Sequence, residues 1–246
     1  WMDQNNNQIA PTYIYSIAQD KNNALWVGTN SGLIVIPASI DFTTSNRCER
    51  VIMPRNDGTQ LGDYLLDNEQ VNAIVVDGAN RLWIGTATSG LYLMQFTPSL
   101  DDADNTLEML AHYTTENSLL PTNDVLSIAI SESTGEVFVG TGGGLVSYMS
   151  DAIEPYEDFG DIYAYPNPVR PNYQGYVTIK GTMESTQVRI IDANGNLIKK
   201  IDSTGGAAVW DCTNVNGDRV ASGVYTALCN TKNGNEHGSI KILIMN

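Results

Sequence analysis

The stretch that decides the fold is Ala24-Leu25-Trp26-Val27-Gly28-Thr29-Asn30-Ser31-Gly32-Leu33, because the chain contains it three times. Residues 81–91 read Arg-Leu-Trp-Ile-Gly-Thr-Ala-Thr-Ser-Gly-Leu, and residues 136–145 read Glu-Val-Phe-Val-Gly-Thr-Gly-Gly-Gly-Leu. The three aromatic residues are 57 and 55 positions apart. A repeat of this size, built of short apolar segments and glycine turns, is typical of a β-propeller blade.

Each repeat predicts a hairpin of two strands. Tyr15–Ala18 and Leu25–Gly28 alternate with the period of two that indicates strands, and the polar segment Gln19–Asn23 between them predicts a turn. We expect Gly28 and Gly32 to lie where a side chain would obstruct packing near the propeller axis. The aromatic residues predict core positions between neighbouring blades rather than a ligand platform: Trp26, Trp83 and Phe138.

The repeat resembles the two-component-regulator propeller repeat, through its strand, Asp-x-x-Gly/Asn, Leu-Trp-x-Gly-Thr and Gly-Leu pattern over residues 11–150. The resemblance implies about three blades over residues 1–150, in a family found in sensor ectodomains and other exported bacterial proteins. Propellers have four to eight blades. We therefore expect the C-terminal part of a longer protein, and self-association if a second copy covers the exposed blade faces.

Composition indicates a globular, β-rich protein. The 246 residues are 42% hydrophobic and include 22 Gly and 12 Tyr. The sequence has no run of ~20 apolar residues that predicts a membrane span. Residues 1–20 do not have the pattern of a signal peptide, so we expect any export signal to lie outside this sequence.

The net charge of −15 is unevenly distributed. Residues 1–160 contain 21 acidic and 5 basic residues, whereas residues 161–246 contain 7 and 8. An acidic surface repels phosphate groups, which argues against nucleic acid as a partner. Cys48, Cys212 and Cys229 are odd in number and lack Cys-x-x-Cys spacing, so we expect free, buried thiols rather than a zinc site or a disulfide framework.

Residues 151–160 predict an acidic linker, and residues 161–246 predict an immunoglobulin-like β-sandwich. In the second region, short alternating segments are separated by turn signals every 8–12 residues, which is typical of sandwiches. The expected strands are Tyr176–Lys180, Gln187–Asp192, Leu197–Ile201, Ala207–Trp210, Gly223–Asn230 and Ser239–Met245.

A second resemblance covers about 80 residues of this region. Its motifs are Tyr165-Pro166-Asn167-Pro168, Trp210-Asp211 and Gly223-Val224-Tyr225, in that order. They resemble the C-terminal sorting domain of type IX secretion cargo, which implies that these residues form the sorting-domain motif. The sequence departs from the family at Cys212, where Gly is usual, and in ending at Asn246 instead of a basic residue.

No catalytic, cofactor-binding or metal-binding set is predicted. His112 and His237 lie in different expected domains, and the glycine-rich run Gly140–Gly144 has no following lysine to make a phosphate loop. The acidic run at 100–105 is better explained as a solvated loop than as a calcium site. A type I′ hairpin likewise explains Asp192, Asn194 and Asn196 better than a cation loop does.

These observations predict a non-enzymatic exported protein of the periplasm, the outer-membrane surface or the extracellular space. With both resemblances taken together, the chain is similar to propeller-containing accessory proteins of type IX secretion. They imply protein partners in a secretion or surface complex, with a glycan as a further candidate ligand. Two alternatives remain open: an oligosaccharide-sensing ectodomain of a hybrid two-component regulator, and the C-terminal part of a surface hydrolase or lyase whose active site lies in missing blades.

Overall fold

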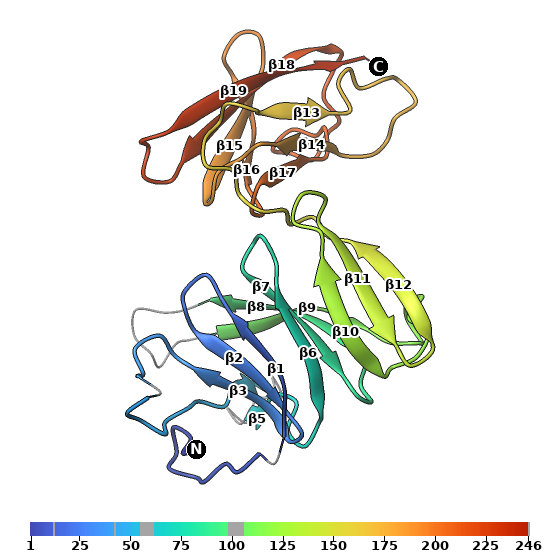
Figure 1. The fold of residues 1–246 in the computed structure, drawn as a ribbon. Helices are drawn as coiled ribbons and strands as arrows, with labels where there is room; N and C mark the ends of the chain where they lie inside the picture. The colour runs from blue at the N-terminus through green and yellow to red at the C-terminus, as the bar shows by residue number, and fades with distance from the viewer. Residues whose placement is uncertain (12, 42, 55–61, 98–105, 246) are drawn as a thin grey trace. The chain divides into compact units, whose positions relative to one another are not determined.

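The computed structural model describes residues 1–11, 13–41, 43–54, 62–97 and 106–245. Within these ranges every regular element is a β-strand, which confirms the all-β class (Figure 1). The described residues include no helix with the length and apolar character of a membrane span. The chain divides into two compact units. The first comprises Trp1–Ser131 and Glu136–Met149, and the second comprises Glu132–Gly135 and Ser150–Asn246.

The first unit consists of three propeller blades, as the repeats predict. In each blade the first three strands pair antiparallel in chain order, with an irregularity near the start of the first pair. The first blade contains β1 (Ile14–Gln19), β2 (Leu25–Thr29) and β3 (Gly32–Ile36). The second contains β6 (Val71–Val76), β7 (Arg81–Thr86) and β8 (Leu91–Thr97), and the third contains β10 (Val125–Ile130), β11 (Glu136–Thr141) and β12 (Gly144–Met149).

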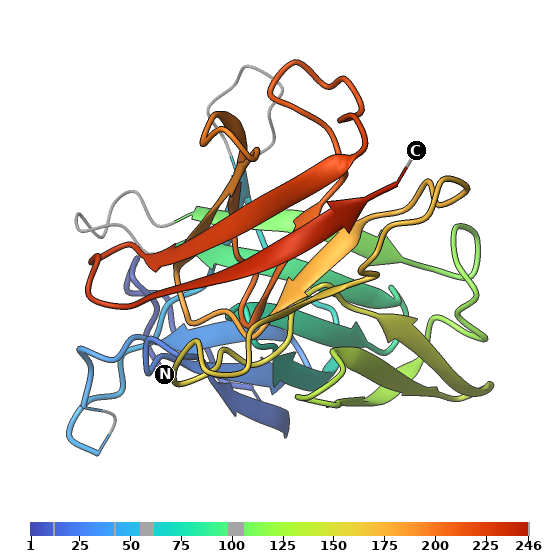
Figure 2. The same cartoon turned by 90° about the horizontal axis from the view of Figure 1, so that it is seen from above.

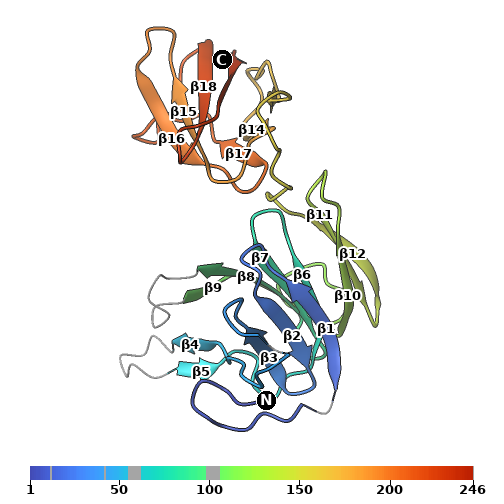
Figure 3. The same cartoon turned by 60° about the vertical axis from the view of Figure 1, so that its left-hand side comes forward.

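The outer strands differ between the blades. The sequence also predicts outer strands at 50–53 and 107–110. In the second blade, β9 (Thr106–Tyr113) pairs with β8 and makes a four-stranded sheet, which confirms the strand predicted at 107–110. In the first blade the strand predicted at 50–53 does not pair with β3. Instead β4 (Ile52–Pro54) pairs with β5 (Gly62–Tyr64) in a separate two-stranded sheet (Figure 3), and a single bridge joins Val35 to Glu49.

Buried tryptophans hold the hairpins of the first two blades. Trp26 and Trp83 are almost completely buried, as expected of core residues. Their indole Nε1 atoms donate hydrogen bonds to Asp20 (2.9 Å) and Asp77 (3.2 Å), the residues that begin the turns. The same prediction is wrong for Phe138, which is 38% exposed because no further blade of the described chain covers its face.

Glycine allows the blades to approach one another. A Cβ atom built on Gly28 would lie 2.7 Å from the carbonyl oxygen of Val71 in the next blade, and one on Gly85 would lie 2.4 Å from Cγ1 of Val125. Such distances are incompatible with a side chain. The prediction that a side chain at position 28 would obstruct packing is thus confirmed. The obstruction comes from Ser16 of the same blade, whose Oγ would lie 2.3 Å away, as well as from Val71 of the next blade.

The second unit contains two antiparallel sheets. The longest strands, β18 and β19, pair along their whole length, as Figure 2 shows. The expected strands form within one or two residues of their predicted ends, and β13 is an additional strand. One sheet has the order β13 (Tyr163–Tyr165), β14 (Val177–Lys180) and β17 (Ala207–Trp210). The other has the order β16 (Leu197–Asp202), β15 (Thr186–Ile191), β18 (Gly223–Thr231) and β19 (His237–Ile244).

A single apolar core lies between these sheets. It includes Trp210 with residues of both layers such as Ile179, Val188 and Ile242, all completely buried. The thiols Cys212 and Cys229 belong to the same core. All three cysteines of the chain are free and buried, which confirms the expectation for Cys48 as well.

The turn at Asp192 is a hairpin turn but not of type I′. Among its residues only Gly195 has a positive φ (85°), whereas type I′ needs two such residues. The Asp192 carboxylate accepts the backbone N–H groups of Asn194 and Asn196 and the side-chain amide of Asn196, so its oxygens serve the turn. The acidic run at 100–105 lies outside the described residues.

Candidate functional site

The Tyr165–Pro168 segment is attached to the last strand by the side chain of Asn167. Its Nδ2 atom donates to the carbonyl oxygen of Lys241 (2.8 Å), and its Oδ1 atom accepts the N–H of Leu243 (3.0 Å). The next backbone pairing, Val169 with Leu243 and Met245, continues this contact. One asparagine side chain thus forms hydrogen bonds with two backbone groups on the outer edge of β19, the Lys241 carbonyl and the Leu243 N–H, beside the Tyr-Pro-Asn-Pro segment.

Trp210 and Tyr225 of the motif meet in the core of the second unit. Their rings pack edge to face with centroids 5.5 Å apart. Both polar ends are satisfied by backbone, since Trp210 Nε1 donates to the carbonyl of Thr213 (2.9 Å) and the Tyr225 hydroxyl donates to that of Ala221 (2.9 Å). Burial raises the pKa of Tyr225. This pair fixes the loops after β17 and before β18 to the core.

Asp211 forms an ion pair with Lys199 of the other sheet. Lys199 Nζ lies 2.8 and 2.7 Å from the two carboxylate oxygens and 2.6 Å from Thr213 Oγ1. Partial burial raises the pKa of Asp211, but the hydrogen bonds from Lys199 and Thr213 outweigh it and hold the pKa below its ordinary value. The carboxylate is therefore a charged structural link between the two sheets.

The residue that follows Asp211 has a backbone that favours glycine. Cys212 has φ of 57° and is completely buried. A left-handed conformation is costly for a residue with a Cβ atom, which gives a physical reason for the usual glycine at this position. The departure at Cys212 therefore keeps the loop geometry and adds a buried thiol to the core.

The motif residues thus serve three separate contacts: the Asn167 attachment, the Trp210–Tyr225 pair and the Asp211–Lys199 pair. Gly223 and Val224 begin β18, opposite Ile244 and Leu243 of β19. Tyr165 stays 71% exposed, and Val224 and Leu243 are also exposed. The motif builds the scaffold of the second unit and leaves an aromatic and aliphatic surface beside the terminal strand.

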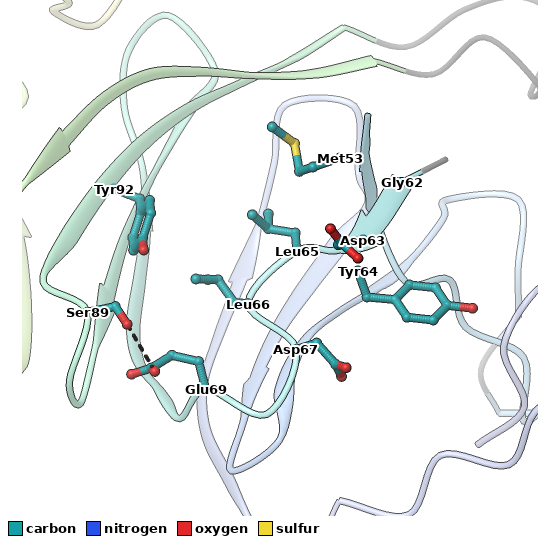
Figure 4. A pocket seen from close by; sticks show the side chains of 10 residues that line it. All are labelled: Met53, Gly62, Asp63, Tyr64, Leu65, Leu66, Asp67, Glu69, Ser89 and Tyr92. Carbon is teal, nitrogen blue, oxygen red and sulfur yellow. Dashed lines mark hydrogen bonds between the residues drawn. The ribbon is translucent and has the colours of Figure 1, made fainter. Parts of the chain in front are cut away.

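The first unit contains a pocket that sequence reasoning did not identify. Its volume is about 750 Å³, and Figure 4 shows the side chains of Leu65 and Leu66 on one side and that of Tyr92 on the other. The β4–β5 pair and the segment after it contribute residues, and so do β8 of the second blade and the turn that precedes it. The full lining is Met53, Gly62, Asp63, Tyr64, Leu65, Leu66, Asp67, Glu69, Ser89 and Tyr92.

Acidic residues in this pocket are already engaged in hydrogen bonds. Glu69 accepts from the backbone N–H of Thr88 (2.8 Å), the Thr88 hydroxyl and the Ser89 hydroxyl (3.0 Å). Asp67 forms an ion pair with Arg50, whose guanidinium lies 3.8 Å from the ring centroid of Tyr64. The pocket is therefore lined by two carboxylates that are held in place, Glu69 and Asp67, and by the aliphatic side chains of Leu65 and Leu66.

His112 lies behind the tyrosine of this pocket. The two rings stack with centroids 4.0 Å apart, and His112 Nε2 lies 2.6 Å from the carbonyl oxygen of Ser89. Burial raises the pKa of Tyr92. The sequence predicts surface positions for both histidines. His112 is half-buried, so the prediction is wrong for this residue, whereas His237 is exposed.

The described residues hold no group of three or more His, Cys, Asp or Glu side chains arranged to bind a metal ion. The pocket was missed because its residues are spread over 53–92 and belong to the parts of the blades that do not repeat. The doublet Leu65-Leu66 amid acidic residues was the one available signal. The geometry suits recognition of a ligand or peptide by contact and hydrogen bonding.

Two families match parts of the chain. The two component regulator propeller family matches residues 8–31 and 65–88, which cover the first hairpins of the first two blades. The FlgD Ig-like domain family matches residues 171–235 and confirms the immunoglobulin-like character of the second unit. The third repeat, with Ser131 and Phe138 in place of Asp and Trp, lies outside the matched residues.

Among solved structures, the chain is similar to PorZ of Porphyromonas gingivalis, described as an essential bacterial surface component of the type IX secretion system. The two share 29% identity with a TM-score of 0.62, over 100% of this chain and 32% of PorZ. The extracellular domain of BT4673 from B. thetaiotaomicron, assigned to a hybrid two component system, shares 14% identity with a TM-score of 0.34, over 99% of this chain and 32% of that chain. No curated protein matches the chain.

The chain spans about a third of the length of PorZ. The similarity to PorZ includes both units, and it supports the resemblance to type IX secretion proteins that the motifs indicate. The chain thus combines two-component-regulator propeller repeats with a FlgD-type immunoglobulin-like domain, and it is similar to one part of PorZ.

Proposed function

We propose that this chain belongs to a non-enzymatic, exported component of the bacterial cell surface that acts with a type IX secretion system. The propeller blades serve as an interaction scaffold, and the immunoglobulin-like unit serves as a secretion or docking module. The observation that carries the proposal is the similarity to PorZ over the whole chain, at 29% identity. Both units contribute to it, so the order of domains is shared as well as each fold.

The chemistry of the sites supports a binding role. In the pocket of the first unit, the oxygens of Glu69 are held by Thr88 and Ser89, and Asp67 is paired with Arg50. General acid–base catalysis by carboxylates needs a proton donor or acceptor that faces the substrate. In the second unit, Asp211 is likewise bound by Lys199 and Thr213. We assign these groups to structure and recognition.

The assignment of partner binding to the first unit is also based on charge. Residues 1–160 carry the acidic excess, whereas residues 161–246 are close to neutral. An acidic scaffold favours basic protein partners through long-range attraction and disfavours polyanions. We therefore place protein partners on the first unit, and we do not assign it an anionic glycan.

Surface localisation in a bacterium with a type IX system tests the proposal. Residues 1–246 behind a general export leader are expressed in P. gingivalis and in a strain that lacks the type IX machinery, and a protease is added to intact cells. We expect cleavage of the chain only in the first strain. Equal protection in both strains would overturn the secretion role, and turnover of a saccharide or peptide substrate by the purified chain would overturn the non-enzymatic assignment.

A further inference from the structure

The pocket of the first unit has an aliphatic side and an aromatic side that face each other. Leu65 and Leu66 point across it toward the ring of Tyr92 (Figure 4). His112 stacks on that ring with centroids 4.0 Å apart, so the ring is held in place. Glu69 extends from the leucine side toward that of Tyr92, and its carboxylate therefore lies beside both apolar surfaces.

Glu69 receives hydrogen bonds from neutral groups and has room for one more. In the part of the chain that the structure describes, its donors are the Thr88 N–H (2.8 Å), the Thr88 hydroxyl (2.9 Å) and the Ser89 hydroxyl (3.0 Å). These groups supply three protons, whereas a carboxylate has about four acceptor positions. One position remains for a donor from a ligand, and none of the three donors compensates the negative charge.

The charge around the pocket favours a cation. Its described lining includes the acidic residues Asp63, Asp67 and Glu69 and no basic residue. Arg50 compensates the charge of Asp67 in an ion pair. The carboxylate of Glu69 has no such partner among the described residues, so it attracts a cationic group and repels an anionic one.

The backbone of Leu66 is unusual for a leucine. Its φ is 54°, in the left-handed region that glycine and asparagine adopt at lower cost. The side chain is only partly buried and packs at the margin of the core. Residues in sparsely populated conformations gather at ligand-binding sites, where the side chain has a task besides folding. The conformation of Leu66 therefore supports a role of its side chain in binding.

Size and chemistry together define the ligand. The volume of about 750 Å³ lies within the range of about 300–1,000 Å³ that is usual for pockets of drug-sized ligands. This is more space than a single ammonium group fills. Lysine and arginine combine an aliphatic stem, which packs on apolar surfaces, with a cationic end that is attracted to carboxylates and aromatic rings.

We propose that this pocket binds a lysine or arginine side chain within a short segment of a partner protein. The stem lies between Tyr92 and the two leucines, and the cationic end donates a hydrogen bond to Glu69. The proposal rests on the protein-binding role proposed for the first unit, and it adds the chemistry by which the partner is recognised.

Binding of short peptides to the complete chain tests the proposal, with the amide signals of Ser89 and Tyr92 followed by NMR. The probes are acetyl-Ala-Ala-Lys-Ala-Ala-amide and its arginine counterpart. In the control peptides the central residue is norleucine, which keeps the stem without the charge, or glutamate. We expect saturable shifts with the lysine or arginine peptide and binding of both controls that is weaker by about tenfold or more, because hydrogen bonds to charged groups contribute more than neutral ones.

Two variants separate the charge from the apolar contact. Glu69→Gln keeps the size and an acceptor oxygen but removes the charge, so it should weaken the lysine peptide by about tenfold. Leu66→Asn removes the aliphatic side chain and should also weaken that peptide, while the fold is kept because asparagine readily adopts a positive φ. Glu108→Gln, at an exposed glutamate of β9 outside the lining, is the matched control and keeps wild-type binding. Circular dichroism verifies the sheet content of each variant.

Four results would overturn the proposal. These are no saturable shift with either basic peptide, equal binding of the norleucine or glutamate peptide, unchanged binding in Glu69→Gln, and equal affinity for acetyl-lysine-amide, which would show an amine site without peptide contacts. The surface localisation of the chain is measured separately on cells. A failure of peptide binding is therefore distinguishable from a failure of the proposed secretion role.

Discussion

The indole nitrogen of Trp26 donates a hydrogen bond to Asp20 Oδ2 at 2.9 Å, with both side chains buried. The other oxygen of Asp20 accepts the N–H groups of Asn22 and Ala24, both at 2.9 Å. One carboxylate thus closes the hairpin turn and anchors the core tryptophan. The third blade has Ser131 and Phe138 at the positions of Asp20 and Trp26. It therefore contains neither the carboxylate nor the indole N–H of this hydrogen bond.

Asp20→Ala is expected to destabilise the first unit by about 3 kcal/mol, because it leaves the buried indole N–H and two turn N–H groups without an acceptor. Urea denaturation measures the loss relative to the wild type. Asp41→Ala is the control, because Asp41 accepts similar turn hydrogen bonds at an exposed site and should cost less than about 1 kcal/mol. Equal losses at Asp20 and Asp41 would contradict the role given to burial.

Gly28→Ala is expected to cost about 2 kcal/mol, because the new methyl group would lie 2.7 Å from the backbone oxygen of Val71. Gly140→Ala is the matched substitution in the third blade. There the nearest atom is the Ser127 hydroxyl at 2.6 Å, which can rotate away, so the cost should be smaller. Thermal unfolding compares the two variants with the wild type. Equal melting temperatures for both variants would show that the contact between blades is not the reason why position 28 requires glycine.

Asn167→Ala is expected to destabilise the second unit by about 2 kcal/mol, since it removes both hydrogen bonds to β19. Asn167→Asp keeps the acceptor for the Leu243 N–H but loses the donor to Lys241. Amide hydrogen exchange at Leu243 should therefore accelerate in the alanine variant more than in the aspartate variant. Asn216→Ala, in an exposed loop of the same unit, is the control. Unchanged exchange at Leu243 in the alanine variant would exclude the attachment.

Acid should destabilise the second unit through Asp211. Its pKa in the folded state lies below the ordinary value of 3.8, so its contribution is complete above that value and is lost as the pH falls through the folded-state pKa. Asp211→Asn should make the free energy of unfolding less dependent on pH between about pH 5 and pH 2. Denaturation curves over this range test the change, with Glu184→Gln as an exposed control. An unaltered pH dependence in Asp211→Asn would refute the assignment.

The three cysteines should resist thiol reagents while the chain is folded. Burial raises the pKa of Cys48 and Cys212, and it raises that of Cys229 to about 12. Thiolates are the reactive form, so few are present at neutral pH. Titration with a disulfide reagent should detect no thiol in buffer and all three in denaturant. Rapid reaction of any cysteine in buffer would show that its site opens.

Repetition explains why so much of the fold was predictable from sequence. The aromatic residue of the repeat recurs after 57 and 55 positions, and a glycine follows it two positions later in each copy, so local patterns determine the strands of each blade. Phe138 has the same local pattern but not the same neighbours, and its exposure depends on contacts made by other blades. Local sequence does not contain that information.

The sites depend on residues that are distant in sequence, which limited their prediction. Asn167 contacts Lys241 and Leu243, more than seventy positions away. Both contacts are made to backbone atoms, so the residue types at these two positions give no sign of them. The pocket combines the pair β4–β5 with β8, and the two-stranded sheet departs from the blade pattern. Motif resemblance located Asn167, but only the structure shows what its side chain does.

The central claim is that the immunoglobulin-like unit directs the propeller unit to the cell surface. The most direct measurement is the fraction of chain cleaved by protease on intact P. gingivalis cells, for residues 1–246 and for a chain that ends at Met149, both behind the same export leader. We predict that the complete chain is cleaved and that the shorter chain is protected while remaining folded. Equal cleavage of both would contradict the claim, because the propeller unit would then reach the surface without the second unit.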